Sequence, residues 1–223
     1  GFSGNQYLLE SQMRVLGGHG YIEYIDHILN LSQSCKKTFS NYELLLFDDV
    51  SSMVEKIKLR NKEVGLSRNV AGFAWEWISK KDKSKCDIRI DGYEYMWNSA
   101  NQDWVNSKNA VNEIGCIHSI QGYDLNYTGV IIGPELMMRD GVLIVDKGKY
   151  FDKKGKFDVQ DVEQLKVYIR NIYKVLLSRG IRGTYIYVCD HGLREYFRRF
   201  VDTYSSGVLY SESIVLELNA AEK

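Results

Sequence analysis

The chain of 223 residues contains a single proline, Pro134, and lacks any proline-rich, serine-rich or repetitive segment. Such segments commonly separate domains, so we expect residues 1–223 to form one domain. No apolar run approaches the roughly 18 to 20 residues that a membrane helix needs, and no basic segment followed by an apolar one opens the chain. We therefore expect a protein of the cytoplasm that has no membrane partner.

Closely spaced metal ligands are also missing. The four cysteines form no CxxC pair, and the four histidines lack the i,i+4 or short-loop spacing that recurs in zinc sites. We expect no protein-bound metal and no disulfide framework, which fits a reducing compartment. Positive charge is not in excess either: Lys plus Arg and Asp plus Glu number 29 each, so binding of nucleic acid would need a local basic patch.

A phosphate-binding loop is absent as well. Nowhere does GxxxxGK precede Ser or Thr, the loop that cradles the β- and γ-phosphates of a nucleotide. The apolar run 44–47 followed by Asp48 and Asp49 looks like a strand that positions Mg²⁺ ligands, but no phosphate loop precedes it. We interpret these two acids as caps of a helix that begins near Ser51.

Short apolar runs alternate with helical patterns along the chain. The runs typical of buried strands are 43–47, 70–75, 114–117, 130–132, 142–145 and 184–189. Helical spacing covers 51–61 and, most clearly, 159–177, which follows Asp158 as a candidate N-cap and ends before Gly180. This alternation predicts an α/β fold with a mostly parallel sheet covered on both faces.

One stretch breaks that alternation. Residues 87–97 alternate in polarity around Asp91-Gly92, which is a strong signal for a two-residue turn. We predict a β-hairpin at about residues 86–98, inserted into the α/β core.

Residues 113–136 are the most informative part of the sequence. They contain a buried strand, a polar turn and a second buried strand. The polar positions are His118, Ser119, Gln121, Gly122 and Asp124. Open α/β sheets place ligands just past the carboxyl ends of their strands, so the turn is a candidate binding site. By composition alone, an ordinary strand–turn–strand connection explains it equally well.

This stretch resembles motif V of superfamily-one helicases. His118, Gln121 and Gly122 match the motif, and Asp124 stands where the family usually has Glu. Cys116 replaces the usual Thr, a position associated with a contact to the nucleic-acid backbone.

Two further elements resemble helicase motifs. Residues 174–180 are similar to motif VI, in which an arginine, here Arg179, reaches across a cleft to the triphosphate. A cation placed favourably at the carboxyl end of a helix, worth roughly 0.3 to 1 kcal/mol, is the alternative explanation. Gln12-Met13-Arg14 resembles the Gln-x-Arg element at the start of the second helicase domain. The three elements occur in the family order.

Longer segments resemble the schlafen-group-three-like DNA/RNA helicase domain family over roughly residues 8–200. The matching segments are 71–75, 90–92 with 97–98, and 115–133. The resemblance implies a three-layer RecA-like fold, the C-terminal RecA-like domain of a superfamily-one P-loop ATPase. The domain that carries the Walker A loop would be missing. The opening Gly1-Phe2-Ser3-Gly4, without Met, fits an excised piece.

The resemblance also implies roles for single residues. Arg14 and Arg179 would be the catalytic contacts, because arginine is a permanent planar cation that stabilises charge during phosphoryl transfer. Gln12, Gln121, Gly122 and Asp124 would line the nucleotide. His118 and Ser119 would contact nucleic acid.

The implied partners follow from those roles. ATP with Mg²⁺ would bind the full-length protein, held by an N-terminal RecA-like domain of the same chain, and single-stranded DNA or RNA would bind across both domains. The isolated chain should be inactive and hold no nucleotide tightly. The rival hypothesis is a non-catalytic nucleic-acid or protein-interaction module with a RecA-like fold.

Basic and aromatic residues elsewhere offer weaker candidates for a nucleic-acid surface. The basic clusters are Lys80, Lys81, Lys83 and Lys85, and Arg194, Arg198 and Arg199. Solvated surface explains both clusters more simply. The four tryptophans, with Tyr123, could stack on unpaired bases, but most of them fit a core position better.

Overall fold

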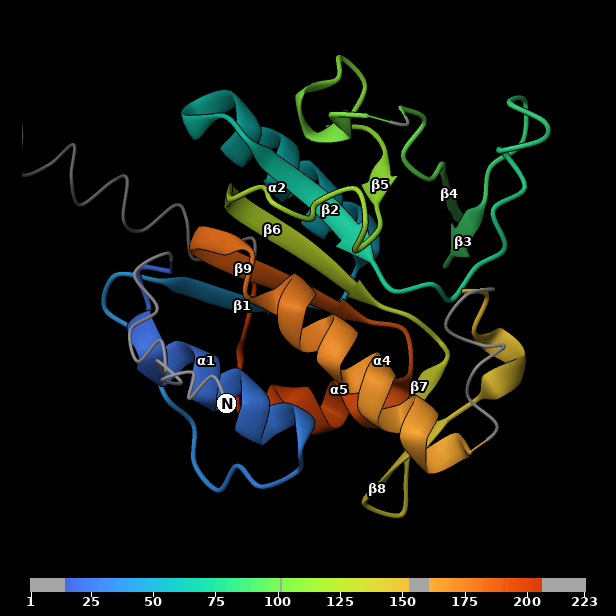
Figure 1. The fold of residues 1–223 in the computed structure, drawn as a ribbon. Coiled ribbons are helices and arrows are strands. Elements are labelled where there is room, and N and C mark those ends of the chain that lie inside the picture. The colour runs from blue at the N-terminus through green and yellow to red at the C-terminus, as the bar shows by residue number, and fades with distance from the viewer. Residues whose placement is uncertain (1–14, 101, 153–160, 206–223) are drawn as a thin grey trace, which may run out of the picture.

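A computed structural model describes residues 15–100, 102–152 and 161–205 (Figure 1). Its centre is a six-stranded sheet in the order β10-β1-β9-β6-β2-β5, in which every pairing is parallel. The strands are β1 (Glu43–Phe47), β2 (Ser67–Ala71), β5 (Ile114–Gly115), β6 (Leu125–Ile132), β9 (Gly180–Val188) and β10 (Asp202–Thr203).

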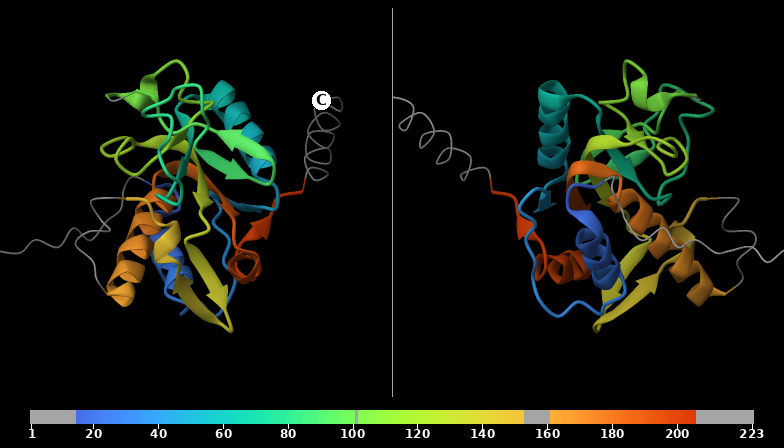
Figure 2. Two further views of the ribbon diagram at one scale, coloured as in Figure 1. Left: turned by 90° about the vertical axis from the view of Figure 1, so that its right-hand side faces the viewer. Right: turned by 60° about the vertical axis from the view of Figure 1, so that its left-hand side comes forward.

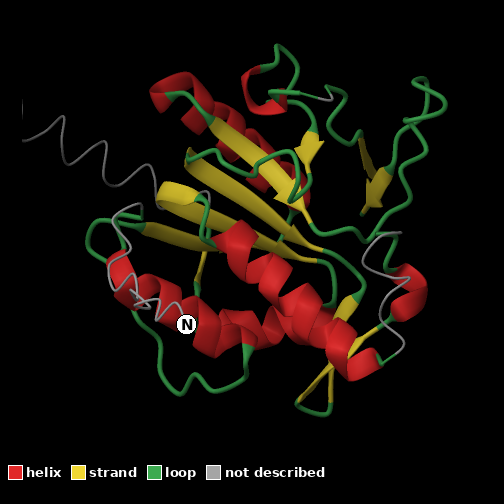
Figure 3. Ribbon diagram, viewed as in Figure 1, coloured by secondary structure: helices red, strands yellow, loops and turns green. Residues whose placement is uncertain are grey.

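Helices cover both faces of this sheet, so the molecule has three layers (Figures 2 and 3). The helices are α1 (Gly18–Leu29), α2 (Val50–Val64), α4 (Val162–Leu177) and α5 (His191–Arg198). Helix α2 packs on one face, and α1, α4 and α5 lie on the other (Figure 1). The predicted α/β class with a parallel sheet and three layers, consistent with a RecA-like fold, is confirmed.

The two central strands are buried over most of their length, as expected for a sheet covered on both faces. From Gly183 to Val188 every residue of β9 is buried, and β6 is buried from Thr128 to its end. The predicted strand at 70–75 ends earlier, at Ala71, because the chain turns away there and Ala74 N–H bonds to Gly72 O instead of a neighbouring strand.

Aspartates cap the helices that flank the sheet. Asp49 accepts a hydrogen bond from Ser52 N–H at 2.6 Å, which confirms its predicted role at the start of α2. Asp161 caps α4, which begins at Val162, later than its apolar spacing indicated. Asp158, the cap expected from the sequence, lies outside the described residues.

Two antiparallel hairpins stand beside the central sheet. The predicted one is confirmed as β3 (Ile88–Ile90) paired with β4 (Tyr93–Tyr95), and Asp91 and Gly92 at its turn both have positive φ. The second hairpin pairs β7 (Leu136–Arg139) with β8 (Val142–Val145). The expectation that residues 142–145 join the main sheet is therefore wrong, because the tight turn at Asp140-Gly141 folds them back onto β7.

Short 3₁₀ turns, η1 (Trp104–Asn106) and η2 (Lys147–Lys149), complete the described elements. Across the described ranges, no helix has both the length and the apolar character needed to cross a membrane.

Candidate functional site

Arg179 and Asp124 lie at the same end of the sheet. Because all six strands are parallel, their amino ends share one end of the sheet, called here the amino end, and their carboxyl ends share the other. Arg179 directly precedes β9 and Asp124 directly precedes the neighbouring β6. Leu125 N–H donates to Arg179 O at 3.2 Å, so the backbones that carry the two side chains are in contact.

The polar turn after β5 connects both ends of the sheet. His118 and Ser119 follow the carboxyl end of β5, and the chain then passes through Gln121 and Gly122 to reach Asp124 at the amino end of β6. The expectation that all these residues gather past a carboxyl end is therefore wrong for Asp124. The chain leaves β5 at its carboxyl end and enters β6, a parallel strand of the same sheet, at its amino end, so the connection must run back along the length of the sheet.

The two predicted nucleic-acid contacts differ in their surroundings. His118 is exposed, and its ring lies 5.7 Å from that of Phe73. The Ser119 hydroxyl accepts from Cys116 N–H and donates to Cys116 O, both at 2.9 Å. That hydroxyl stabilises the turn itself, whereas the His118 side chain faces solvent.

Buried hydroxyl groups hold the backbone on the helix side of Arg179. Leu177 O accepts from the Tyr21 hydroxyl at 2.7 Å and from the Thr184 hydroxyl at 3.1 Å. Both donors are fully buried, and burial raises the pKa of Tyr21 to about 12, so this phenol stays protonated. The end of α4 is thereby fixed against β9.

A third hydroxyl holds the strand side. The Tyr42 hydroxyl donates to Gly180 O at 3.2 Å and lies 2.7 Å from the Thr184 hydroxyl. Gly180 has no room for a side chain, since a Cβ there would lie 2.1 Å from Gly183 O. Arg179, half-buried, therefore sits between two backbone positions that are each anchored by buried side chains.

A β-bulge follows at once. Leu125 pairs with Gly180 but Tyr127 pairs with Gly183, so β9 has one residue more than β6 over this interval. Bulges are frequent next to functional sites because they redirect side chains. The additional stretch contains the exposed Arg182, three residues after Arg179.

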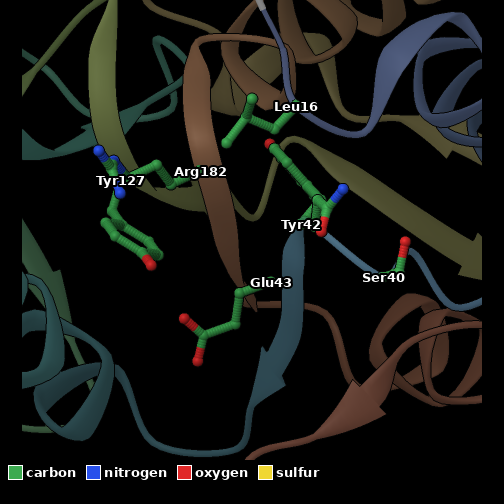
Figure 4. Close-up of a pocket in the computed structure, with 7 residues that line it drawn as sticks. Leu16, Ser40, Tyr42, Glu43, Tyr127 and Arg182 are labelled. Carbon is green, nitrogen blue, oxygen red and sulfur yellow. The ribbon is translucent and has the colours of Figure 1, made fainter.

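An open cavity of about 310 Å³ adjoins this bulge at the amino end (Figure 4). The residues that line it are Leu16, Ser40, Asn41, Tyr42, Glu43, Tyr127 and Arg182. The Arg60 guanidinium lies 4.7 Å from the Tyr127 ring centroid and donates to Glu43 at 2.7 Å. The cavity wall thus carries charge of both signs next to the turn that holds Arg179.

The carboxyl end of the sheet holds a buried carboxyl group instead. Glu135 follows β6 and is 1% exposed. The Tyr173 hydroxyl donates to its Oε1, while Oε2 has no hydrogen-bond partner among the described residues. Burial raises the pKa of Glu135 to about 7.

Other acids at the carboxyl end are engaged by protein groups. The Tyr187 hydroxyl donates to Asp91 at the tip of the β3–β4 hairpin, and Arg194 donates to the same hydroxyl at 3.1 Å. Asp48 pairs with Arg198 at 2.6 Å, and Arg198 also donates to Glu195. Of the three arginines in the predicted basic cluster, Arg198 is therefore paired with acids of the molecule, and Arg194 donates to uncharged oxygens.

The tryptophans divide into two groups. Trp97 and Trp104 are buried in the core, whereas Trp75 and Trp77 are partly exposed on the segment after β2. Lys80 lies 5.0 Å from the Trp77 ring centroid. This segment therefore keeps both aromatic surface and a cation within reach of solvent.

Gln12 and Arg14 lie outside the described residues. The described chain begins next to the site, because Leu16 N–H donates to Ile181 O at 2.9 Å, within the bulge of β9. Within the described ranges, no three side chains of His, Cys, Asp and Glu gather as a metal-binding group.

A three-layer α/β domain with Arg179 and Asp124 before adjacent parallel strands is consistent with the RecA-like class. The family model for the Schlafen group 3, DNA/RNA helicase domain matches residues 2–190, and the chain belongs to this family. An uncharacterized protein of Saccharomyces cerevisiae is 28% identical over an alignment of 217 residues. That alignment covers 85% of this chain and 47% of the yeast protein, so the chain spans about half the length of this relative.

Sequence reasoning missed Tyr42, Thr184 and Arg182. Arg182 had a signal, since it is a second arginine three residues after Arg179. Tyr42 and Thr184 had none, because their hydroxyls meet across 142 residues of sequence, and Tyr42 lies 138 residues from Gly180, whose carbonyl it contacts.

Proposed function

We propose that this chain is the second RecA-like domain of a nucleic-acid-dependent ATPase, supplying arginine contacts to a nucleotide held by another domain of the full-length protein. The observation that carries the proposal is the placement of Arg179 and Asp124 before adjacent strands, with their backbones hydrogen-bonded. Family membership supports the helicase-like character.

The residues present suit one half of a nucleotide site. Arg179 is a permanent cation in a turn whose backbone carbonyls are anchored by Tyr21, Tyr42 and Thr184. Phosphoryl transfer builds negative charge on the transferred group, and a fixed arginine lowers the energy of that state. The cradle for the β- and γ-phosphates must come from elsewhere, since the sequence contains no phosphate loop.

Each proposed residue has a separate task. ATP bound with Mg²⁺ would supply the phosphoryl group, and Arg179, with Arg14, would stabilise the charge that develops on it. The exposed carboxylate of Asp124 would accept a hydrogen bond from the ribose or from the attacking water. Gln12, Gln121 and Gly122 would line the nucleotide beside it.

We place the single strand of DNA or RNA at the opposite end of the sheet. His118 is exposed there, and the partly exposed Trp75 and Trp77 offer ring surface on which bases can stack. Lys80 beside Trp77 would pair with a phosphate. The Ser119 hydroxyl would act through the turn that it stabilises, which positions His118.

The decisive experiment measures ATP turnover by the full-length protein with and without a single strand, beside its Arg179→Ala variant. We expect the strand to stimulate turnover and the substitution to lower it by roughly 10³-fold or more, the scale known for loss of an arginine finger. The matched control is Arg199→Ala, which removes an equal charge from the carboxyl end of α5. Turnover that is equal with and without Arg179 would favour the non-catalytic interaction module instead.

A further inference from the structure

We infer that Tyr42 is a positioning residue for Arg179, acting with Thr184 through the backbone of the turn. The inference rests on the proposed function, because it concerns how the arginine of that site is held. The hydrogen bonds that the Tyr42 hydroxyl makes within the described residues go to Gly180 and Thr184, so its action on Arg179 would pass through the backbone. Gly180, whose carbonyl oxygen it contacts, is the residue after Arg179.

The turn that carries Arg179 is anchored on both sides by one connected group of hydroxyls. Thr184 donates to Leu177 O, which precedes the turn, and its oxygen lies 2.7 Å from the Tyr42 hydroxyl. Tyr42 in turn donates to Gly180 O. Each hydroxyl has one proton, so while Tyr42 donates to Gly180 O, Thr184 donates either to Leu177 O or to Tyr42, and Tyr21 bonds Leu177 O in both cases. In either arrangement the carbonyls that bracket Arg179 are held by side chains that are almost completely buried.

The same tyrosine ties the turn to the rest of the fold. Its ring lies 4.2 Å, between centroids, from that of Tyr21, which itself donates to Leu177 O. Tyr42 directly precedes β1, the neighbour of β9 on the side away from β6. Arg179 is therefore fixed relative to β1, β6 and β9 together.

Such anchoring matters for an arginine that acts in a transition state. A cation that is already oriented stabilises developing charge without reorganising, and a displacement of about 1 Å can cost on the order of 100-fold in rate. A loosened turn should therefore lower kcat. It should leave KM for ATP nearly unchanged, because the domain with the phosphate loop supplies most ground-state binding.

The test uses Tyr42→Phe in the full-length protein, which removes only the hydroxyl. The matched control is Tyr24→Phe: Tyr24 is also fully buried, and its hydroxyl donates to a backbone carbonyl outside the Arg179 turn, Phe200 O at 2.7 Å. Each variant should lose a similar, small part of the stability with its hydrogen bond. We expect kcat to fall about 10- to 100-fold in Tyr42→Phe and less than about twofold in Tyr24→Phe.

A second variant with its own control keeps the inference testable if Tyr42→Phe fails to fold. Thr184→Val removes the other anchoring hydroxyl. Its control is Thr128→Val, since Thr128 is the register partner of Thr184 on β6, is equally buried, and has a hydroxyl without a hydrogen-bond partner among the described residues. Thr184→Val should lower kcat by about the same 10- to 100-fold as Tyr42→Phe, and Thr128→Val should not.

The double variant Tyr42→Phe with Arg179→Ala separates positioning from general damage. If Tyr42 acts only through Arg179, the double variant turns over ATP no more slowly than Arg179→Ala alone. A further loss in the double variant, or equal losses in Tyr42→Phe and Tyr24→Phe, overturns the inference and leaves the proposed function standing. If Arg179→Ala itself changes nothing, both fall.

Discussion

At the amino end of the central sheet, buried hydroxyls hold backbone carbonyls, and the charged side chains Arg179, Asp124 and Arg182 remain half-buried or exposed. At the carboxyl end, buried or partly buried tyrosine hydroxyls bind two acidic side chains: Tyr173 donates to Glu135, and Tyr187 donates to Asp91. Open α/β sheets commonly bind ligands at the carboxyl end. Here the molecule's own side chains fill that end where β6 and β9 finish, which leaves the amino end as the candidate nucleotide site and the exposed segment after β2 for the single strand.

The strongest test of this difference concerns the buried carboxyl group. The pKa of Glu135 is raised from 4.5 to about 7, so the folded protein binds this proton more tightly than the unfolded chain does. Stability from this group is full below about pH 4.5 and is lost as pH rises through about 7, by on the order of 3 kcal/mol. We expect Glu135→Gln to remove that part of the pH dependence.

Urea unfolding at pH 5 and at pH 8 measures this effect directly. The free energy of unfolding of the wild-type chain should fall between pH 5 and pH 8. In Glu135→Gln, most of that fall should be absent. Identical pH dependence in the two proteins would contradict a buried, protonated Glu135, and with it the idea that the carboxyl end is closed.

The next effect concerns the hairpin that docks on the carboxyl end. Asp91→Asn keeps a residue suited to the positive φ of the turn but removes the charge that accepts from Tyr187. We expect a loss of about 1 to 2 kcal/mol in the free energy of unfolding, because hydrogen bonds to charged groups are the stronger ones.

The second hairpin provides the control for that substitution. Asp140 has nearly the same φ at the equivalent turn position, and among the described residues its carboxylate has no hydrogen bond to the central sheet. Asp140→Asn should therefore change the free energy of unfolding by less than about 0.5 kcal/mol. Equal effects at both positions would mean that the Asp91 contact does not stabilise the fold.

The smallest expected change in stability tests whether Asp49 is a helix cap or a metal ligand. Asp49→Ala should cost about 1 kcal/mol through loss of the hydrogen bond to Ser52 N–H, and ATP turnover by the full-length protein should stay within about twofold of wild type. Thermal unfolding and turnover, measured side by side, check both statements. A large fall in turnover with unchanged stability would instead indicate that Asp49 is a ligand of Mg²⁺ at the nucleotide site.

Local signals explain which elements could be predicted. The Asp91-Gly92 turn and the apolar spacing of α4 are short-range patterns, and both appear in the structure. Helix α1 was missed because its first residues, Gly18 and Gly20, disfavour helices. Tertiary burial of Tyr21, Tyr24 and Ile25 stabilises the helix instead, and sequence alone does not reveal that burial.

The candidate site was only partly accessible for the same reason. Arg179 and Asp124 could be chosen from their motifs, but their meeting at the amino end depends on strand order. Nothing in the sequence states that β6 and β9 are neighbours, because 47 residues separate Ile132 from Gly180. The hydroxyls that anchor the turn depend on that order as well.

The central position of β9 also has a consequence for how the chain is made. This strand joins the β10–β1 pair to the β6–β2–β5 group, yet among the described strands only β10 follows it in the chain. A ribosome that has produced β1, β2, β5 and β6 has produced the β6–β2–β5 group and the single strand β1, with no strand to link the two. Strand pairings this distant in sequence form slowly and leave edges exposed in the meantime. The sheet therefore closes late in translation, and a nascent chain that stops before residue 188 exposes the apolar flanks of that group and of β1.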